Sequence, residues 1–269
     1  MSAGASNRGF FITGTDTGVG KTLVAVALTR ALAQRGIRTA VMKPVAAGAM
    51  ETPDGLRNDD ALELLAASNV KSAYEDVNPW LLKTPASPHL AARHDGVSIG
   101  VEKILTAFRR LTAASDLVMV EGAGGWLAPI SSVATMADIA EKLALPVIFV
   151  VGMRLGCLNH ALLTREAIRS HGLPFAGWIA NKMHSEMALV GPNIDSLASR
   201  FGAAPLGIVP AGAGKDWGHS SFPPEGGKWG RASEARPHLL GNEECPHSFP
   251  AGAGSPAWAV EVVNKLVSP

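Results

Sequence analysis

The 269-residue sequence has little cysteine and almost no net charge. Its two cysteines, Cys157 and Cys245, are too few for a disulfide framework, so a reducing cytoplasm is the expected compartment. With 24 basic and 23 acidic residues the net charge is only +1, which argues against a protein that binds nucleic acid through bulk charge.

Long apolar runs are also missing. One of the longest, residues 143–152, contains Pro146 and is far shorter than the roughly 20 residues of a membrane-spanning helix. The first nine residues are small and polar, so we expect no targeting segment. We therefore expect a cytoplasmic protein that does not associate with membranes.

Up to residue 210 the sequence alternates between apolar strand-like segments and helical segments. We expect strands at residues 10–13, 38–42, 117–120, 147–151, 177–180 and 206–209, and helices at 22–34, 59–67, 101–112 and 159–170. Nearly continuous apolar strands separated by helices are typical of a parallel sheet. The sequence therefore predicts an α/β fold over residues 1–210, resembling P-loop NTPases, with a mostly parallel sheet and helices on both faces.

Residues 211–269 differ in composition. Residues 211–255 are rich in glycine and proline and contain neither valine nor isoleucine, so this segment cannot bury enough apolar surface to offset the entropy of ordering. A helical pattern returns at residues 257–267. We expect a poorly ordered tail that ends in a short, weakly docked helix.

A glycine-rich segment, Gly-Thr-Asp-Thr-Gly-Val-Gly-Lys-Thr, occupies residues 14–22 between the first predicted strand and helix. In that position glycines let backbone amides converge on a phosphate, and the helix N-terminus adds partial positive charge. Lys21 can reach terminal phosphate oxygens, and the Thr22 hydroxyl can ligate Mg²⁺. The outer glycines enclose five residues instead of the usual four. A ligand-free turn is the alternative, but the Gly-Lys-Thr ending favours a nucleotide.

Charged residues follow two further predicted strands. Glu121 ends one strand at the carboxyl edge of the sheet, where α/β proteins bind ligands, and it could hold Mg²⁺ beside the phosphate loop. Lys43 ends another strand at the same edge. Lysines that stabilise developing charge and acids that hold metal suit phosphoryl transfer. Taken alone, however, Lys43 also fits a solvated lysine, and Asp59 or Asp60 fits a helix cap.

These residues and several later segments resemble the dethiobiotin synthetase family. The segments are the phosphate loop, Lys-Pro-Val-Ala at 43–46, Gly-Leu-Arg-Asn-Asp-Asp at 55–60, Val-Glu-Gly-Ala-Gly-Gly-Trp at 120–126, Val-Gly-Met-Arg-Leu-Gly-Cys-Leu-Asn-His at 151–160 and Gly-Trp-Ile-Ala-Asn at 177–181. They occur in order between residues 8 and 210. Many ATPases share the phosphate loop, but the joint occurrence of the later segments is far more specific.

The resemblance implies an ATP-dependent ligase of biotin biosynthesis. In the family, 7,8-diaminopelargonate, CO₂ and ATP give dethiobiotin, ADP and phosphate, with Mg²⁺. One amine captures CO₂ as a carbamate, ATP phosphorylates the carbamate, and the second amine closes the cyclic urea and expels phosphate. The resemblance also implies a homodimer with each site near the interface.

The same resemblance implies roles for individual residues. Lys21 and Lys43 would be catalytic: Lys21 would hold phosphate and the mixed anhydride, and Lys43 would stabilise the carbamate and its phosphorylation. The Mg²⁺ ligands would be Thr22, Asp60 and Glu121, with Asp60 preferred to Asp59. The ATP-binding residues would be Gly18, Val19, Gly20, Lys21, Thr22, Leu23, Asp60, Glu121, Gly122, Ala123, Gly124, Asn181, Val209, Pro210 and Ala211, with Asn181 on the adenine.

The diamine would be bound by residues of both subunits. The implied contacts are Lys43, Ala47, Gly125, Leu155, Gly156, Cys157 and Asn159. Residues 155–159 would come from the partner subunit, where a helix N-terminus would receive the substrate carboxylate. No catalytic role is expected for the Cys157 thiol, because a lone cysteine is more often a small buried hydrophobe.

Two features depart from the family pattern. Ala47 stands where the family often has serine, and no segment after Pro210 resembles the family. Two other functions also stay open. A cobyrinic-acid-type amide ligase would need a glutaminase domain, which has no counterpart after Pro210. A partition-type nucleotide switch usually carries an additional lysine early in the phosphate loop, where residues 15–17 are Thr-Asp-Thr.

Overall fold

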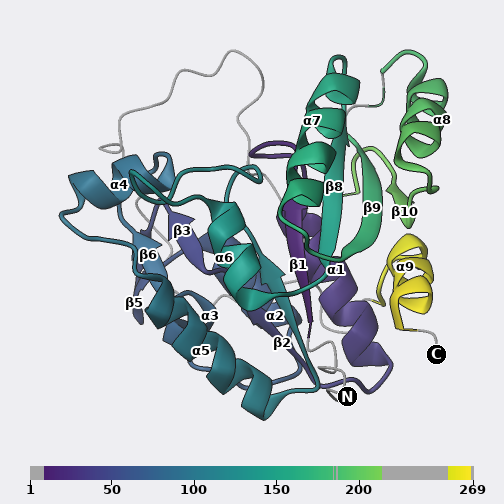
Figure 1. Ribbon diagram of the computed structural model, residues 1–269. Helices are drawn as coiled ribbons and strands as arrows, with labels where there is room; N and C mark the ends of the chain where they lie inside the picture. Colours follow the sequence, from purple (N-terminus) through teal and green to yellow (C-terminus); the bar gives the residue numbers. More distant parts are fainter. Residues whose placement is uncertain (1–8, 184, 186, 214–253, 268–269) are drawn as a thin grey trace, which may run out of the picture.

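A six-stranded parallel sheet forms the centre of the fold (Figure 1). The computed structural model describes residues 9–183, 185, 187–213 and 254–267. The strands run in the order β10-β9-β8-β1-β7-β2, and every pairing between them is parallel. Their bounds are β1 (Gly9–Gly14), β2 (Thr39–Met42), β7 (Leu117–Glu121), β8 (Val147–Met153), β9 (Phe175–Lys182) and β10 (Gly207–Val209).

Helices cover both faces of this sheet, as the sequence predicts. One face carries α1 (Lys21–Gln34), α2 (Asp59–Ala67) and α9 (Ala257–Val267), and the other carries α5 (Val101–Ala114), α6 (Met136–Leu143), α7 (Cys157–Ser170) and α8 (Val190–Phe201). Side chains of a strand alternate between the faces, so Phe11 joins one apolar core while Phe10 and Ile12 join the other. The α/β prediction is confirmed.

A group of short elements follows β2. The small strand β3 (Val45–Ala47) pairs in parallel with β6 (Trp80–Leu82), and β4 (Met50–Thr52) forms a hairpin with β5 (Gly55–Arg57). The short helix α4 (Pro88–His94) packs on β3 and β6, and the short helix α3 (Tyr74–Val77) packs between β2 and α5. Their position after β2 places them around the carboxyl end of that strand, where Lys43 lies.

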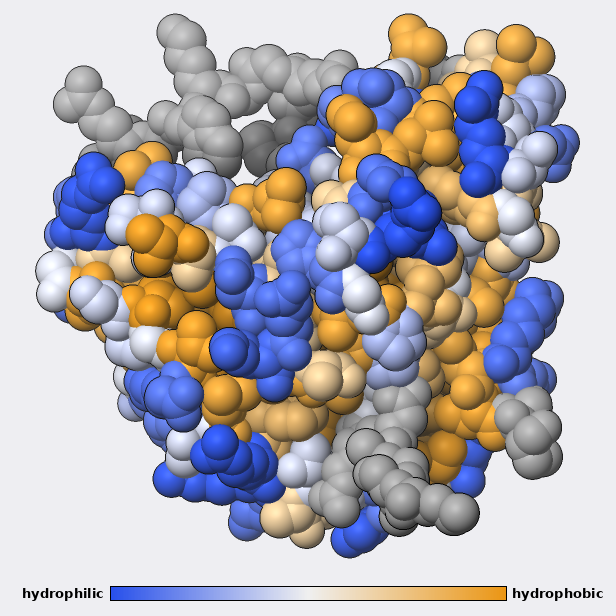
Figure 2. Space-filling model, viewed as in Figure 1, coloured by the Kyte–Doolittle hydropathy of each residue, from blue (hydrophilic) through white to orange (hydrophobic). Residues whose placement is uncertain are grey.

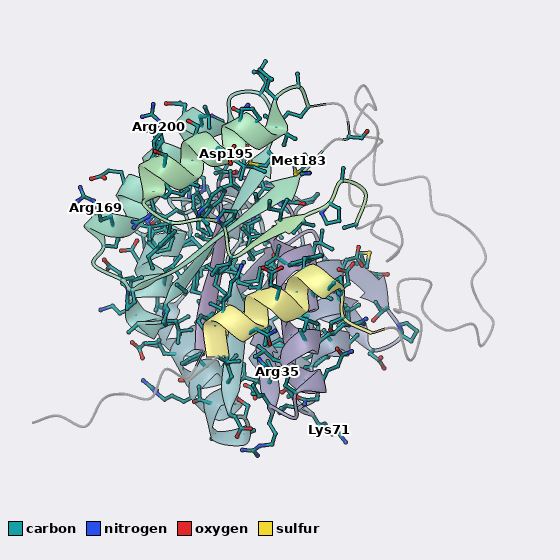
Figure 3. All side chains as sticks on the ribbon, turned by 90° about the vertical axis from the view of Figure 1, so that its right-hand side faces the viewer. Arg35, Lys71, Arg169, Met183, Asp195 and Arg200 are labelled. Atoms are coloured by element: carbon teal, nitrogen blue, oxygen red, sulfur yellow. The ribbon has the colours of Figure 1, made fainter. Side chains whose placement is uncertain are left out.

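The helix predicted at residues 257–267 is α9, and it packs closely against the rest of the fold. It lies alongside α1 and against β10 (Figure 3). Ala259, Val262 and Val263 are fully buried within the core that α1 and α2 share with the sheet. The expectation of a poorly ordered tail falls mainly on residues 214–253, which lie outside the described residues. No helix in the described part of the chain is long and apolar enough to cross a membrane.

Candidate active site

The phosphate loop joins the end of β1 to the start of α1, in the strand–loop–helix context that the sequence predicts. Gly18 and Gly20 adopt positive φ values of 73° and 90°, which only glycine accepts readily. A Cβ on Gly20 would also collide with the side-chain amide of Asn181. A Cβ on Gly14 would lie 2.5 Å from Val19. These glycines therefore permit a backbone path that a side chain would block.

Lys21 extends back over this loop. Its Nζ donates a hydrogen bond to the carbonyl of Asp16 at 2.7 Å, and the residue is only 6% exposed. Burial, together with the nearby charge of Lys43, lowers the pKa of Lys21 to about 8. Asp16 is itself fixed, because its carboxylate accepts from the Thr17 amide and pairs with Arg154 at 2.8 Å. The ammonium is thus held at the loop where a phosphate would bind.

Lys43 lies between two carboxylates at the carboxyl edge of the sheet. Its Nζ is 2.7 Å from Asp60 Oδ2 and 2.6 Å from Glu121 Oε1. Thr22 Oγ1 donates to the same Glu121 oxygen at 2.9 Å. The structure thus brings together four residues that lie far apart in the sequence, and Lys43 is buried, which excludes the solvated-lysine alternative.

The pKa values of this cluster follow from burial and charge. Burial disfavours the ammonium of Lys43, but the two carboxylates outweigh this effect and raise its pKa. Burial also opposes ionisation of Asp60, yet Lys43 lowers the pKa of that carboxyl. Glu121 is the most enclosed, and burial raises its pKa despite the opposing charge of Lys43. Glu121 Oε2 is buried and has no hydrogen-bond partner.

The glycine segment after Glu121 lies against the phosphate loop. A Cβ on Gly125 would be 3.5 Å from the Thr15 carbonyl, and one on Gly122 would be 3.2 Å from Phe11 and Met136. Trp126, which follows, is 2% exposed and packs edge-on against Phe11. The segment is therefore held close to the loop on one side and to the core on the other.

Asn181 reaches the phosphate loop from the end of β9. Its Nδ2 donates to the Val19 carbonyl at 2.9 Å and lies 3.5 Å from the sulfur of Met183, which Figure 3 labels. Val209 pairs with Asn181 in the register of β10 and β9, so residues 209–211 leave the sheet beside it. The structure thus shows Asn181 bracing the loop, and its contact with adenine stays a prediction.

Comparison with known proteins identifies relatives of this chain. A family model described as an AAA domain matches residues 8–215. The ATP-dependent dethiobiotin synthetase BioD of Cellvibrio japonicus (strain Ueda107) is 50% identical over 205 residues, covering 76% of this chain and 90% of that protein. The protein of the same name from Xanthomonas oryzae pv. oryzae (strain PXO99A) is 49% identical, covering 75% and 90%. This chain belongs to the ATP-dependent dethiobiotin synthetase family.

Solved structures resemble the chain only distantly. The MinC:MinD cell division protein complex of Aquifex aeolicus gives a TM-score of 0.47 at 20% identity, covering 75% of this chain and 80% of that chain. A ParA family ATPase from Chlorobium tepidum TLS gives 0.47 at 16% identity, covering 76% and 85%. Assignment to the dethiobiotin synthetase family therefore rests on the sequence relatives.

The segment that the family resemblance assigns to the partner's site begins α7. Arg154, just before it, pairs with Asp16 and so ties this segment to the phosphate loop of the same chain. Leu155 is 98% exposed and Asn159 is exposed, whereas Cys157 is buried. Ala47 lies in β3, away from this segment in sequence and only partly buried. The diamine contacts of these residues stay predictions.

Sequence reasoning missed the residues that support the cluster from behind. Asn58 caps α2 by accepting from the Ala61 amide, whereas Asp59 and Asp60 lie in the first turn of the helix. Tyr74 and Asn78 link this cap to Lys43 and were not singled out at all. A lone tyrosine and an asparagine in a short polar stretch carry no motif that could have identified them.

Proposed function

We propose that this protein closes 7,8-diaminopelargonate and CO₂ into dethiobiotin, using ATP and Mg²⁺, at Lys21 and the cluster of Thr22, Lys43, Asp60 and Glu121. The observation that carries the proposal is the position of Lys43, whose ammonium is held between two carboxylates beside the phosphate loop. An ammonium there can offset the repulsion between a carbamate and the terminal phosphate of ATP.

Three side chains of the cluster fit Mg²⁺. Thr22 supplies a hydroxyl, and Asp60 and Glu121 supply carboxylates, a set of hard oxygen donors that this ion prefers. Glu121 Oε2 is a buried oxygen without a hydrogen-bond partner, as expected of an atom kept for a cation. When bound, Mg²⁺ neutralises charge on the phosphate oxygens.

The two lysines have separate roles in the proposed reaction. Lys21, held over the loop, binds oxygens of the transferred phosphate as charge moves onto them. Lys43 remains protonated, because its pKa is raised, and draws the carbamate towards the phosphate. A carbamate oxygen then attacks the terminal phosphorus and the bond to ADP breaks. Finally the second amine attacks the carbonyl carbon, loses its proton and expels phosphate.

The other end of the diamine is proposed to meet a second copy of the chain. Leu155, just before α7, and Leu163 of α7 are 98% and 63% exposed, and Leu127 and Val133 of the loop before α6 are 53% and 91% exposed. Figure 2 shows apolar residues interspersed with polar ones over this face of the molecule. Burying such side chains would stabilise a homodimer in which residues 155–159 reach the partner's site.

The single described cysteine, Cys157, is free, which fits a reducing cytoplasm.

Mass spectrometry of the products tests the proposed function. The protein is incubated with 7,8-diaminopelargonate, bicarbonate, MgCl₂ and ATP, and with each component omitted in turn. We expect dethiobiotin to form in step with phosphate, and phosphate release to need the diamine. Phosphate release that is indifferent to the diamine, without dethiobiotin, would instead indicate a nucleotide switch.

A further inference from the structure

We propose that Tyr74 is a positioning residue that fixes the positions of Lys43 and Asp60 relative to each other. Its hydroxyl joins the backbone of Lys43 to the helix that carries Asp60, through a closed circuit of hydrogen bonds. The inference rests on the proposed function of Lys43 and Asp60, and it adds a residue that touches neither substrate nor metal.

One side of the circuit fixes α2. The Tyr74 hydroxyl accepts a hydrogen bond from the backbone amide of Asn58 at 2.8 Å. Asn58 is the N-cap of α2, and Asp60 lies in the first turn of that helix. The N-cap sets where a helix begins, so a constraint on Asn58 fixes the position of the Asp60 carboxylate.

The other side fixes Lys43. The Tyr74 hydroxyl donates to Asn78 Oδ1 at 3.3 Å, and Asn78 Nδ2 donates to the Lys43 carbonyl at 2.7 Å. The Lys43 amide donates to the Val77 carbonyl, also at 2.7 Å. Lys43 is therefore held on both backbone groups, by the last residue of α3 and by the residue that follows it. The ion pair between Lys43 and Asp60 closes the circuit.

The hydroxyl suits this place because it can donate and accept at once. Asn58 presents an N–H that needs an acceptor, and Asn78 presents an oxygen that needs a donor. Both residues are largely buried, at 9% and 3% exposure, so water is poorly placed to substitute. The guanidinium of Arg57 lies 4.3 Å from the centre of the Tyr74 ring and holds the ring in place. Phenylalanine would keep that ring contact and lose only the bridge.

The circuit spans a stretch of chain that is otherwise weakly constrained. Between Lys43 and Asp60 lies the hairpin of β4 and β5, whose residues are mostly exposed. The bridge therefore adds a second polar link to the ion pair between the start of α2 and Lys43. A small displacement of reacting groups lowers a rate far more than it lowers binding.

Tyr74→Phe tests the proposal against Ser68→Ala as a matched control. The Ser68 hydroxyl also links α2 to β2, by donating to the Thr39 carbonyl at 2.8 Å, but it does so at the ends away from Lys43 and Asp60. Both variants therefore lose one partly buried hydroxyl that takes part in hydrogen bonds at one end of α2. We expect similar losses in free energy of unfolding. Only Tyr74→Phe should lower kcat, by about 10-fold, and raise the Mg²⁺ concentration for half-maximal rate, with KM for ATP changed less than about 2-fold.

A second readout does not depend on catalysis. Tyr74 is the only tyrosine of the sequence, so protein grown with 3-fluorotyrosine gives a single ¹⁹F resonance. Asp60→Asn weakens the ion pair at the far side of the circuit and should shift this resonance. Ser68→Ala should leave the resonance in place.

Two results would overturn the proposal: a kcat for Tyr74→Phe no lower than that for Ser68→Ala, or a ¹⁹F resonance that Asp60→Asn does not move. Absence of dethiobiotin from the unmodified protein would instead refute the proposed function. In that case the ¹⁹F comparison still decides whether the circuit couples the two residues.

Discussion

Lys43 illustrates how a residue that looks ordinary in sequence acquires a special state in the fold. Its ammonium would be costly to bury alone, and the carboxylates of Asp60 and Glu121 offset that cost. The result is a lysine that stays charged inside the protein at the ligand edge of the sheet. A fixed cation in such a site acts more strongly on developing charge than one in water.

Replacing Lys43 with alanine should therefore reduce turnover far more than nucleotide binding. We expect kcat to fall by about 10²-fold or more, since removal of one group that stabilises transition-state charge typically has that effect. Phosphate release measures kcat, and calorimetry measures the Kd for ATP. Lys142→Ala, at an exposed position of α6, is the control. An unchanged kcat would remove Lys43 from the mechanism.

Replacing Glu121 with glutamine tests whether this residue binds Mg²⁺. Glutamine keeps the shape of the side chain but loses the charge that favours a cation. We expect the Mg²⁺ concentration for half-maximal rate to rise by at least about 10-fold. Glu141→Gln, at an exposed position of α6, should leave the Mg²⁺ titration unchanged. Identical titrations for the two variants would count against ligation by Glu121.

At the scale of elements, the sequence predicts best where one strong pattern dominates. The apolar runs of β1, β7 and β8 are buried along their whole length, and each was predicted as a strand. Helix α8 was not predicted, and its first turn contains Gly191 and Pro192, which disfavour a helix interior but are tolerated at its start. Helix α6 was missed too, despite a capping box between Thr135 and Asp138 that marks its start.

The same contrast holds for the candidate site, where sequence motifs predict some residues and tertiary packing brings in others. Motifs at strand ends predicted Lys21, Thr22, Lys43 and Glu121, because parallel strands bring their carboxyl ends to one edge. The choice between Asp59 and Asp60 depends on the direction of a side chain in the first turn of α2. In the structure the Asp60 carboxylate pairs with the Lys43 ammonium, whereas Asp59 is exposed. Contacts such as those of Tyr74 depend on tertiary packing and carry no local signal.

The phosphate loop depends on glycine at Gly20 for two separate reasons, and a matched pair of variants separates them. Gly36 has a similar positive φ of 79° but nothing within 4 Å of an added Cβ, whereas a Cβ on Gly20 would meet Asn181. Both Gly20→Ala and Gly36→Ala should destabilise the fold by about 1–2 kcal/mol through the left-handed backbone. Only Gly20→Ala should also weaken ATP binding, measured by calorimetry. Equal Kd values for the two variants would contradict this account of the loop.

At the scale of the whole molecule, the chain's last described helix completes a core that the first helix begins. Helix α9 lies along α1 and packs against β10, the edge strand of the sheet. A Cβ on Gly207 would lie 2.6 Å from Val262, so the contact is close. Helices α9 and α1 thus belong to the same core.

Replacing Val262 and Val263 together with alanine tests this docking. Both side chains are fully buried, so we expect the free energy of unfolding to fall by about 2–4 kcal/mol, from lost burial and the cavities left behind. Denaturant unfolding measures the change. Val260→Ala, at 38% exposure on the same helix, should change it by less than about 0.5 kcal/mol. Equal effects would show that α9 contributes little to the core.

The fate of the oxygens of CO₂ tests the central claim, that a carbamate is phosphorylated beside Lys43. The protein is given 7,8-diaminopelargonate, ATP and CO₂ labelled with ¹⁸O in both positions, and the products are analysed promptly by mass spectrometry. Phosphorylation of a carbamate oxygen predicts one ¹⁸O in the released phosphate and the other in the carbonyl of dethiobiotin. Unlabelled phosphate alongside labelled dethiobiotin would contradict the account.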